Sequence, residues 1–211
     1  MRKIGLMFIG LLLILAVVAG CSQPVPSVPS VPATQPAEEA VVPEATEPPE
    51  EVQSASDTTL FTITSPAFVD GAEIPVKYTC NGQNISPALN WSGSPAGTAS
   101  FALIMDDPDA SVGVFNHWVV FNLPSDYQGL AEGITKDTEL SGGGLQGKNA
   151  AQRVSYVGPC PPIGHPHHYT FTLYALDITL DLSAGATKKQ VLEAIEGHIL
   201  GQAQLVGLYQ R

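Results

Sequence analysis

From residue 60 onward, the pattern of apolar residues is typical of short β-strands. Residues 169–176 alternate polar and apolar side chains, which is the period of a strand with one buried face. Other apolar runs are bounded by Gly, Pro, Asn or Asp, the residues that favour turns. The pattern predicts strands at residues 60–64, 101–105, 117–123, 169–176 and 202–209. Short strands punctuated in this way favour a sandwich over a parallel α/β sheet.

One helix is predicted before the last strand. Thr187 and Gln190 have the spacing of a capping box, in which each side chain bonds to the other residue's backbone N–H. The apolar residues that follow recur at helical spacing and form one stripe, made of Val191, Leu192, Ile195 and Ile199. The segment is therefore mainly β, and we expect two packed sheets with a helix near the C-terminus.

The N-terminus has the pattern of a targeting segment. Arg2 and Lys3 precede an apolar run at residues 4–18, which is shorter than the ~20 residues that span a bilayer. The run ends in Val-Ala-Gly before Cys21, which resembles the cleavage site of a bacterial lipoprotein signal. We expect cleavage after residue 20 and acylation of Cys21, which would anchor the protein in the membrane. The alternatives are an ordinary secretory signal or an uncleaved anchor.

The next segment, residues 21–57, is predicted to be a tether. It contains eight prolines and seven acids, and it has no aromatic residue and no helical or strand period. Such a composition buries too little apolar surface to offset the entropy of ordering. A folded domain at 58–211 would thus be held at the extracytoplasmic face of the cell membrane.

The formal charge of −11 is informative about partners only when the charge of each segment is counted separately. Residues 58–211 contain 13 acids and seven bases, a net charge of −6. Because nucleic-acid affinity comes mainly from Lys and Arg, an acidic domain without a basic stripe argues against a nucleic-acid partner. A segment of roughly 150 residues buries enough surface to fold as one domain.

Polar residues cluster at three of the predicted strand ends. Asp-Asp-Pro-Asp at 106–109 follows one strand, His117 begins another, and a Gly- and Pro-rich loop at 156–168 leads into a third. Each cluster alone has an ordinary explanation, because Asp-Pro-Asp is a common turn and a single His is common at a strand end. Strand ends are nevertheless where a rigid sandwich presents polar groups in a concave mouth.

Taken together, the clusters resemble the phosphatidylethanolamine-binding protein family, in its bacterial and archaeal branch that is often labelled Raf-kinase-inhibitor-like. The resemblance covers roughly residues 60–211. It rests on five ordered motifs: Asn84-Ile85-Ser86-Pro87, Asp107-Pro108-Asp109-Ala110, His117-Trp118-Val119-Val120-Phe121-Asn122-Leu123-Pro124, Tyr156-x-Gly158-Pro159-Cys160-Pro161-Pro162-x-Gly164 with His167-x-Tyr169, and Leu173-Tyr174-Ala175-Leu176-Asp177.

The resemblance implies a two-sheet antiparallel β-sandwich with Greek-key connections and one small anion pocket. It assigns ligand binding to nine residues: Asp107, Asp109, His117, Gly158, Pro159, Pro161, Pro162, His167 and Tyr169. Imidazoles and loop N–H groups can donate to the oxygens of phosphate, phosphoethanolamine or a carboxylate. The sequence departs from the family at His168, where an Arg is usual, so one charge near the mouth is missing.

The cysteines allow two interpretations. With Cys21 acylated, Cys80 and Cys160 remain, and two cysteines in a loop-rich domain outside the cytoplasm usually form a disulfide. Alternatively, Cys160 lies close to two histidines and is a candidate nucleophile for a weak hydrolase. We favour the disulfide.

Metal binding and enzymatic activity are two further possibilities for these polar residues. Asp107, Asp109, His117 and His167 are acceptable metal ligands, but their spacing matches no established metal motif. No Gly-x-Ser-x-Gly motif of a serine hydrolase is present. We therefore expect a binding protein without catalytic activity, metal or cofactor. The alternative is a module that binds or inhibits a protein in the cell envelope, through loops such as 140–144.

Overall fold

The structure, a computed structural model, describes residues 60–211. The predicted signal peptide, the tether and Cys21 lie outside the described residues. Within residues 60–211, no helix is long and apolar enough to cross a membrane.

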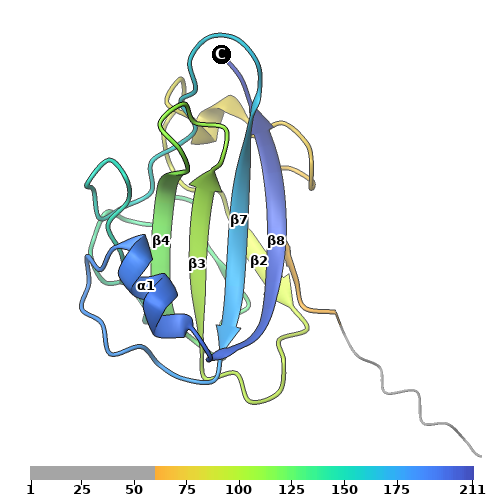
Figure 1. Ribbon diagram of the computed structural model, residues 1–211. Coiled ribbons are helices and arrows are strands. Elements are labelled where there is room, and N and C mark those ends of the chain that lie inside the picture. Colours follow the sequence, from red (N-terminus) through yellow and green to blue (C-terminus); the bar gives the residue numbers. More distant parts are fainter. Residues whose placement is uncertain (1–59) are drawn as a thin grey trace, which may run out of the picture. The chain divides into compact units, whose positions relative to one another are not determined.

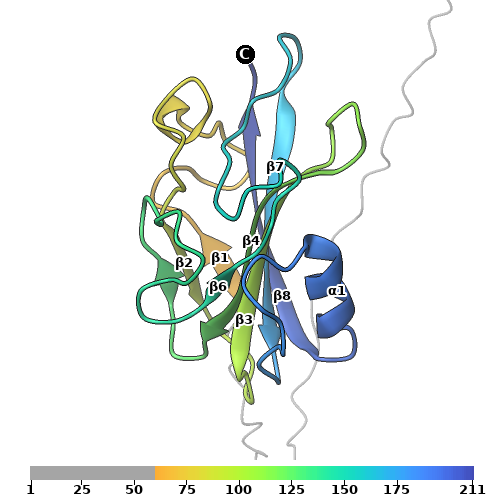
Figure 2. The same ribbon diagram turned by 90° about the vertical axis from the view of Figure 1, so that its left-hand side faces the viewer.

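Two antiparallel sheets pack face to face (Figures 1 and 2). The smaller sheet has the order β1-β2-β5, with β1 at Thr62–Thr64, β2 at Leu89–Ser92 and β5 at Gly129–Leu130. The larger sheet has the order β6-β4-β3-β7-β8, formed by β6 (Leu145–Gln146), β4 (Phe115–Pro124), β3 (Ser100–Asp107), β7 (His167–Leu176) and β8 (Ile199–Tyr209). The connection from β6 to β7 crosses the sheet and places β7 beside β3. The prediction of a mainly β, two-sheet antiparallel fold is confirmed.

Two short helices complete the fold. A 3₁₀-helix, η1 (Val76–Tyr78), precedes β2, and α1 (Lys188–Ile195) precedes β8. Figure 2 shows α1 on the face of the larger sheet that is opposite the smaller sheet. The predicted capping box is present, because the Thr187 side chain accepts from the Gln190 backbone and Gln190 bonds back to the N-cap.

Strand alternation divides the apolar residues of the larger sheet between two cores. On β3, Phe101, Leu103 and Met105 face the smaller sheet, whereas Ala102 and Ile104 face α1. The strand is buried on both faces and therefore reads as a continuous apolar run rather than an alternating one. This double burial fixes the strands whose ends form the site described below.

The structure corrects several predicted boundaries. The helix ends at Ile195, because Glu196 is extended and Gly197 has a φ of 81°. Ile199, predicted to lie on the apolar stripe of the helix, instead begins β8 and is 44% exposed. The strands β3, β4, β7 and β8 are each longer than predicted, and the polar residues at the ends of β3 and β7 belong to the sheet.

Candidate functional site

The candidate site forms where β3 ends and β7 begins. Asp107 is the last residue of β3, and His167 is the first residue of β7. Alternate residues of a strand face the same side, so Asp107 and His167 face the smaller sheet, as Met105 and Phe171 do. Although the two residues are 60 positions apart, the antiparallel pairing of β3 with β7 brings them together at one end of the sandwich.

A β-bulge in β4 brings His117 to the same face. Met105 pairs with Trp118, but the next residue of β3, Asp106, pairs with Asn116, so His117 is the extra residue of β4. In strict alternation His117 would lie on the opposite face from Trp118, which is the face covered by α1. The bulge re-aims its side chain, and the ring lies 5.2 Å from that of Tyr169, centroid to centroid.

Asn116 holds the bulge in place. Its side-chain amide donates to the carbonyl oxygens of Met105 and Trp118 and to the carboxylate of Asp106. The three acceptors come from both strands of the hairpin, so one buried side chain fixes the irregular register. This role of Asn116, which precedes the strand predicted at 117–123, was not predicted from the sequence.

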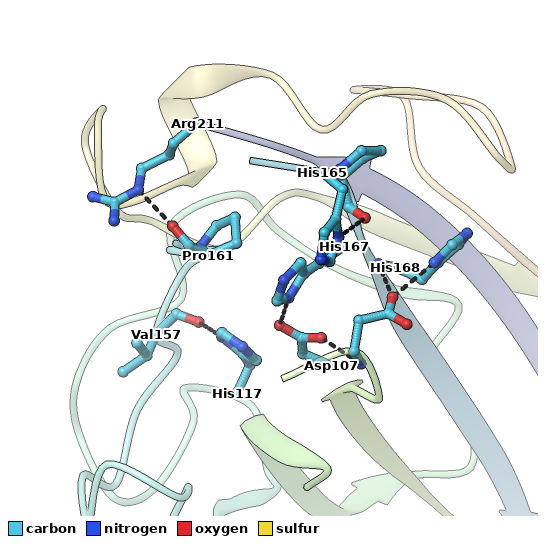
Figure 3. A network of polar contacts seen from close by, with 10 residues as sticks. Asp107, His117, Val157, Pro161, His165, His167, His168 and Arg211 are labelled. Atoms are coloured by element: carbon cyan, nitrogen blue, oxygen red, sulfur yellow. Dashed lines mark hydrogen bonds and ion pairs between the residues drawn. The ribbon is translucent and has the colours of Figure 1, made fainter. Parts of the chain in front are cut away.

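The imidazole of His167 forms a buried pair with a carboxylate. Its Nδ1 lies 2.8 Å from Oδ2 of Asp107, and the two residues are 5% and 4% exposed. The other carboxylate oxygen, Oδ1, accepts from the backbone N–H of Asp109 at 2.9 Å. Both oxygens of Asp107 are thus engaged, and the ring of His167 is fixed with Nε2 directed away from the pair (Figure 3).

The imidazole of His117 contacts a carbonyl rather than a carboxylate. Nδ1 donates to the backbone oxygen of Val157 at 2.7 Å, and the rings of Phe115 and Tyr169 pack against the imidazole edge-on. Burial lowers the pKa of His117 below its ordinary value, and the Val157 carbonyl and the Asp107 charge oppose this effect only in part. The uncharged imidazole is therefore the favoured form at neutral pH.

The loop that carries Val157 is fastened to the segment at residues 78–84. The backbone N–H of Gly158 donates to Oδ1 of Asn84 at 2.7 Å, and the N–H of Cys80 donates to the oxygen of Pro159 at 3.0 Å. A side chain at Gly158 would clash, because a Cβ there would lie 2.3 Å from the oxygen of Tyr78. Gly158 therefore permits close packing of two loops.

A disulfide joins the same two segments. Cys80 and Cys160 are bonded, with Cα atoms 5.4 Å apart, as the cysteine count predicts. The sulfur of Cys160 is not a thiol in this state, so the structure gives no free nucleophile at this position. At the other end of the loop, Nε of Arg211 donates to the oxygen of Pro161 at 2.6 Å.

These elements enclose a pocket of about 160 Å³. It is lined by Asp107, Ala110, Ser111, Val112, Phe115, His117, Val157, Gly158, Cys160, Pro161, Pro162 and His167. Its volume lies below the ~300 Å³ at which pockets for drug-sized molecules begin, so it suits a small chemical group. A larger hollow of about 860 Å³ lies beside Phe61, Trp91 and Tyr127, but it is open and contains none of the predicted site residues.

Of the nine residues assigned to ligand binding, six line the pocket: Asp107, His117, Gly158, Pro161, Pro162 and His167. Asp109 lies outside it and accepts from the backbone N–H and the ring of His168, which lower the pKa of Asp109. Pro159 contributes the carbonyl that accepts from Cys80. Phe115 and Val112 also line the pocket and were not predicted, although their position after Asp-Pro-Asp was a usable signal.

Tyr169 lies beneath the pocket and is fully buried. Its hydroxyl has no hydrogen-bond partner among the described residues. Burial, together with the negative charge of Asp107, raises the pKa of Tyr169 well above its ordinary value. The hydroxyl is therefore a neutral group at physiological pH.

The loop provides fewer N–H donors than the sequence suggested. The N–H of Val157 donates to the oxygen of His117, and that of Gly158 is bonded to Asn84. The three prolines at 159, 161 and 162 have no N–H.

Within residues 60–211, no three His, Cys, Asp or Glu side chains are grouped closely enough to hold a metal ion.

Comparison with known proteins gives one consistent result. The family model of the phosphatidylethanolamine-binding proteins matches residues 64–210. A "UPF0098 protein" of Methanothermobacter thermautotrophicus is 54% identical over 145 residues, which cover 69% of this chain and 95% of that protein. A protein of Mycobacterium tuberculosis named "Putative lipoprotein LppC" is 46% identical over 151 residues, covering 71% of this chain and 72% of that protein.

A solved structure supports the same fold. The crystal structure of YbcL from E. coli, described as a member of the mammalian PEBP family, superposes with a TM-score of 0.68 at 32% sequence identity. The match covers 72% of this chain and 98% of the YbcL chain.

Proposed function

The chain belongs to the phosphatidylethanolamine-binding protein family, and from this premise we propose that it is a lipid-anchored, extracytoplasmic binding protein whose small pocket holds a phosphate-like anion. The predicted signal at 1–20, the acylated Cys21 and the tether at 21–57 are parts of this proposal. A relative that is named a lipoprotein supports them.

The observation that carries the proposal is the buried pair of His167 and Asp107 beside His117. A buried carboxylate is costly without a nearby positive charge, and His167 is the residue placed to supply one. An imidazolium at His167 would also present Nε2–H to a ligand oxygen, because Nδ1 is already bound to Asp107. The pocket thus combines a donor that contacts a carboxylate with a volume suited to a phosphate-sized group.

We propose binding rather than catalysis. The candidate nucleophile, Cys160, is engaged in a disulfide, and the Ser111 hydroxyl in the pocket lining forms no hydrogen bond with either imidazole. Among the described residues, the pocket therefore pairs no nucleophile with a base.

Calorimetric titration of the full-length chain with inorganic phosphate in a phosphate-free buffer at pH 6 tests this function. We expect saturable one-to-one binding at millimolar concentration or below, and binding that is lost in the variant His167→Ala. The matched control is His198→Ala, because His198 forms an exposed pair with Asp177 outside the pocket. Absence of binding to the folded wild type would contradict the proposal.

A second candidate function, recognition of a protein, is favoured by the exposed apolar side chains around the pocket mouth. Val112 is 84% exposed and Ile163 is 86% exposed, on the two loops that flank the pocket. The loop at 140–144 does not support this function, because Leu140 is only 8% exposed and Gly142 packs against Tyr127.

A photoreactive residue at position 112 tests this second candidate in intact cells. A discrete adduct from position 112, without the same adduct from the equally apolar control position 69, would support a protein partner at the mouth. Val69 is 73% exposed and does not line the pocket. Identical adducts from both positions, or none, would count against it.

A further inference from the structure

The two pocket imidazoles have the same hydrogen-bond arrangement. In each ring the Nδ1–H is donated to a protein acceptor, which is the carbonyl of Val157 for His117 and the carboxylate of Asp107 for His167. The Nε2 atom is therefore the nitrogen left for a ligand. A neutral imidazole with its proton on Nδ1 can only accept a hydrogen bond at Nε2, and only an imidazolium can donate there.

The two rings have different surroundings. His167 contacts the Asp107 carboxylate directly, stacks against His165 and lies near Tyr169. His117 contacts a neutral carbonyl and two aromatic rings, while the charges of Asp107, Asp106 and His167 act on it from a greater distance. A positive charge in the pocket would lie in contact with the Asp107 carboxylate at His167, whereas at His117 it would contact only a neutral carbonyl and two aromatic rings. The geometry therefore makes Nε2 of His167 the nitrogen placed to donate and Nε2 of His117 the nitrogen placed to accept.

No cationic side chain in the pocket lining could replace an imidazole as a donor to the ligand. Among the twelve residues that line the pocket there is no Lys or Arg. The N–H groups of Val157 and Gly158 are used within the protein. The donors without a protein partner among the described residues are the Ser111 hydroxyl and the N–H groups of Ala110, Ser111, Val112 and Cys160 in the lining, together with the Tyr169 hydroxyl beside the two imidazoles. All of these donors are uncharged, so His167, which contacts a carboxylate, is the ring placed to donate to an anion, and Nε2 of His117 is the acceptor that faces it.

We propose that the pocket selects phosphate groups that carry a proton, with the ligand P–OH donating to Nε2 of His117 and an anionic oxygen accepting from Nε2–H of His167. This inference rests on the proposed anion-binding function and names the class of ligand. Inorganic phosphate and singly protonated phosphomonoesters fit both nitrogens. Sulfate and phosphodiesters have no such proton at neutral pH, so an anionic oxygen would face the lone pair of His117. Lipid headgroups linked as diesters belong to the disfavoured class.

Comparison of four anions by calorimetry at pH 6, with the full-length chain in a non-ionic detergent, tests the inference. We expect inorganic phosphate and methyl phosphate to bind at least tenfold more tightly than sulfate and dimethyl phosphate. Equal affinity for all four anions would overturn the inference and leave the proposed anion pocket standing. Binding of none of the four would instead contradict the proposed function itself.

The pH dependence of the two phosphate affinities shows whether binding requires a proton on the ligand or a proton on the protein. Methyl phosphate loses its P–OH with a pKa of about 6, so only about 1% of it is protonated at pH 8. Inorganic phosphate keeps a P–OH at that pH. Between pH 6 and pH 8 we expect methyl phosphate to weaken by up to about fiftyfold relative to inorganic phosphate. Loss of protein protons would weaken both ligands together, so an unchanged ratio would contradict the inference.

A matched pair of variants identifies the residue that sets specificity. His117→Lys replaces the acceptor with a donor, and we expect it to bind sulfate as tightly as phosphate. His167→Lys replaces one cationic donor with another, and we expect it to keep the preference for phosphate. Thermal unfolding shows whether each variant is folded. If His117→Lys does not fold, the anion series on the wild type decides alone. A folded His117→Lys variant that still rejected sulfate would overturn the assignment.

Discussion

At the scale of single residues, His117 is the group whose protonation is coupled most clearly to folding. Burial lowers its pKa below the ordinary value of 6.5. As pH falls below that value, the unfolded chain binds a proton at His117 before the folded chain does. The stability contributed by the neutral ring is therefore present above pH 6.5 and is lost as pH falls toward the folded pKa.

We predict that NMR titration of the ligand-free protein gives a midpoint for His117 below 6.5. We also predict that the free energy of unfolding falls more between pH 7.5 and pH 5 in the wild type than in the variant His117→Gln, which cannot titrate at this position. Denaturant unfolding at the two pH values measures the difference. A wild-type loss equal to that of His117→Gln would show that this ring does not carry the effect.

Six of the twelve residues that line the pocket were assigned from the sequence, but without the role of each. The motifs grouped Asp107, His117 and His167, and the structure brings these three residues to one pocket. The hydrogen-bond partners depend on tertiary contacts between distant segments, such as Val157 with His117, 40 positions away. Fewer loop N–H groups are free than expected for the same reason, since those of Val157 and Gly158 bond to segments that the local sequence does not indicate.

At the scale of elements, the strand β4 contains two irregularities that have different consequences. One is the bulge at His117, held by Asn116. The other lies at Asn122, where φ is 55° and the side chain bonds both the N–H and the oxygen of Leu180. Both side chains stabilise the backbone of the same strand, but only the first irregularity adjoins the pocket.

We predict that Asn116→Ala and Asn122→Ala each destabilise the fold by roughly 1–3 kcal/mol, because buried acceptors lose their donors. Only Asn116→Ala should also weaken phosphate binding, by about tenfold or more, since His117 then loses its fixed position. Urea unfolding and calorimetry measure the two effects. Equal affinities in the two variants would mean that the bulge does not position the pocket imidazole.

The disulfide is the second element that shapes the site. It closes a loop of 80 residues and connects the pocket loop to the segment that also provides Asn84. We predict that the double variant Cys80→Ser/Cys160→Ser loses roughly 4–5 kcal/mol of stability in the chain-entropy model. Urea unfolding checks this value, and the matched control is the wild type after reduction. Two free thiols in the denatured, unreduced domain would show that the bond does not form.

Element types were predictable from sequence, whereas irregular register was not. The pattern of polar and apolar residues located the long strands, and the Thr-x-x-Gln spacing located the capping box. A bulge changes which residues of a strand face which side of the sheet, and it leaves no obvious mark in the sequence. In β4, the pattern alone would place His117 on the face that α1 covers. The helix end was misjudged because Ile199 continues the apolar spacing by coincidence after Gly197 has ended the helix.

At the scale of the whole molecule, the chain enters the domain at the end that is opposite the pocket. A Cβ on Gly201, near the start of β8, would lie 3.6 Å from the ring of Phe61, whereas Tyr209 pairs with His167 at the pocket. Eight residues of extended strand separate the two positions, a distance of about 27 Å. With Cys21 as the anchor, the pocket would be at the end of the domain away from the tether attachment.

We predict that Cys21→Ala removes membrane anchoring. The wild type should partition with membranes and the variant should remain in the aqueous phase, because acyl chains supply the binding energy. Fractionation with detergent phase separation measures the distribution. A Cys21→Ala protein that still partitioned with membranes would indicate an uncleaved apolar anchor at residues 4–18.

NMR observation of the imidazole nitrogens of His117 and His167 during addition of inorganic phosphate at pH 6 tests directly whether the pocket binds phosphate. We predict saturable shifts at Nε2 of both rings at millimolar phosphate or below, with His198, which lies outside the pocket, changing much less. We also predict that the Nδ1 signals stay those of protonated nitrogens throughout. If neither Nε2 signal moves, the pocket does not bind phosphate and the proposed function is contradicted.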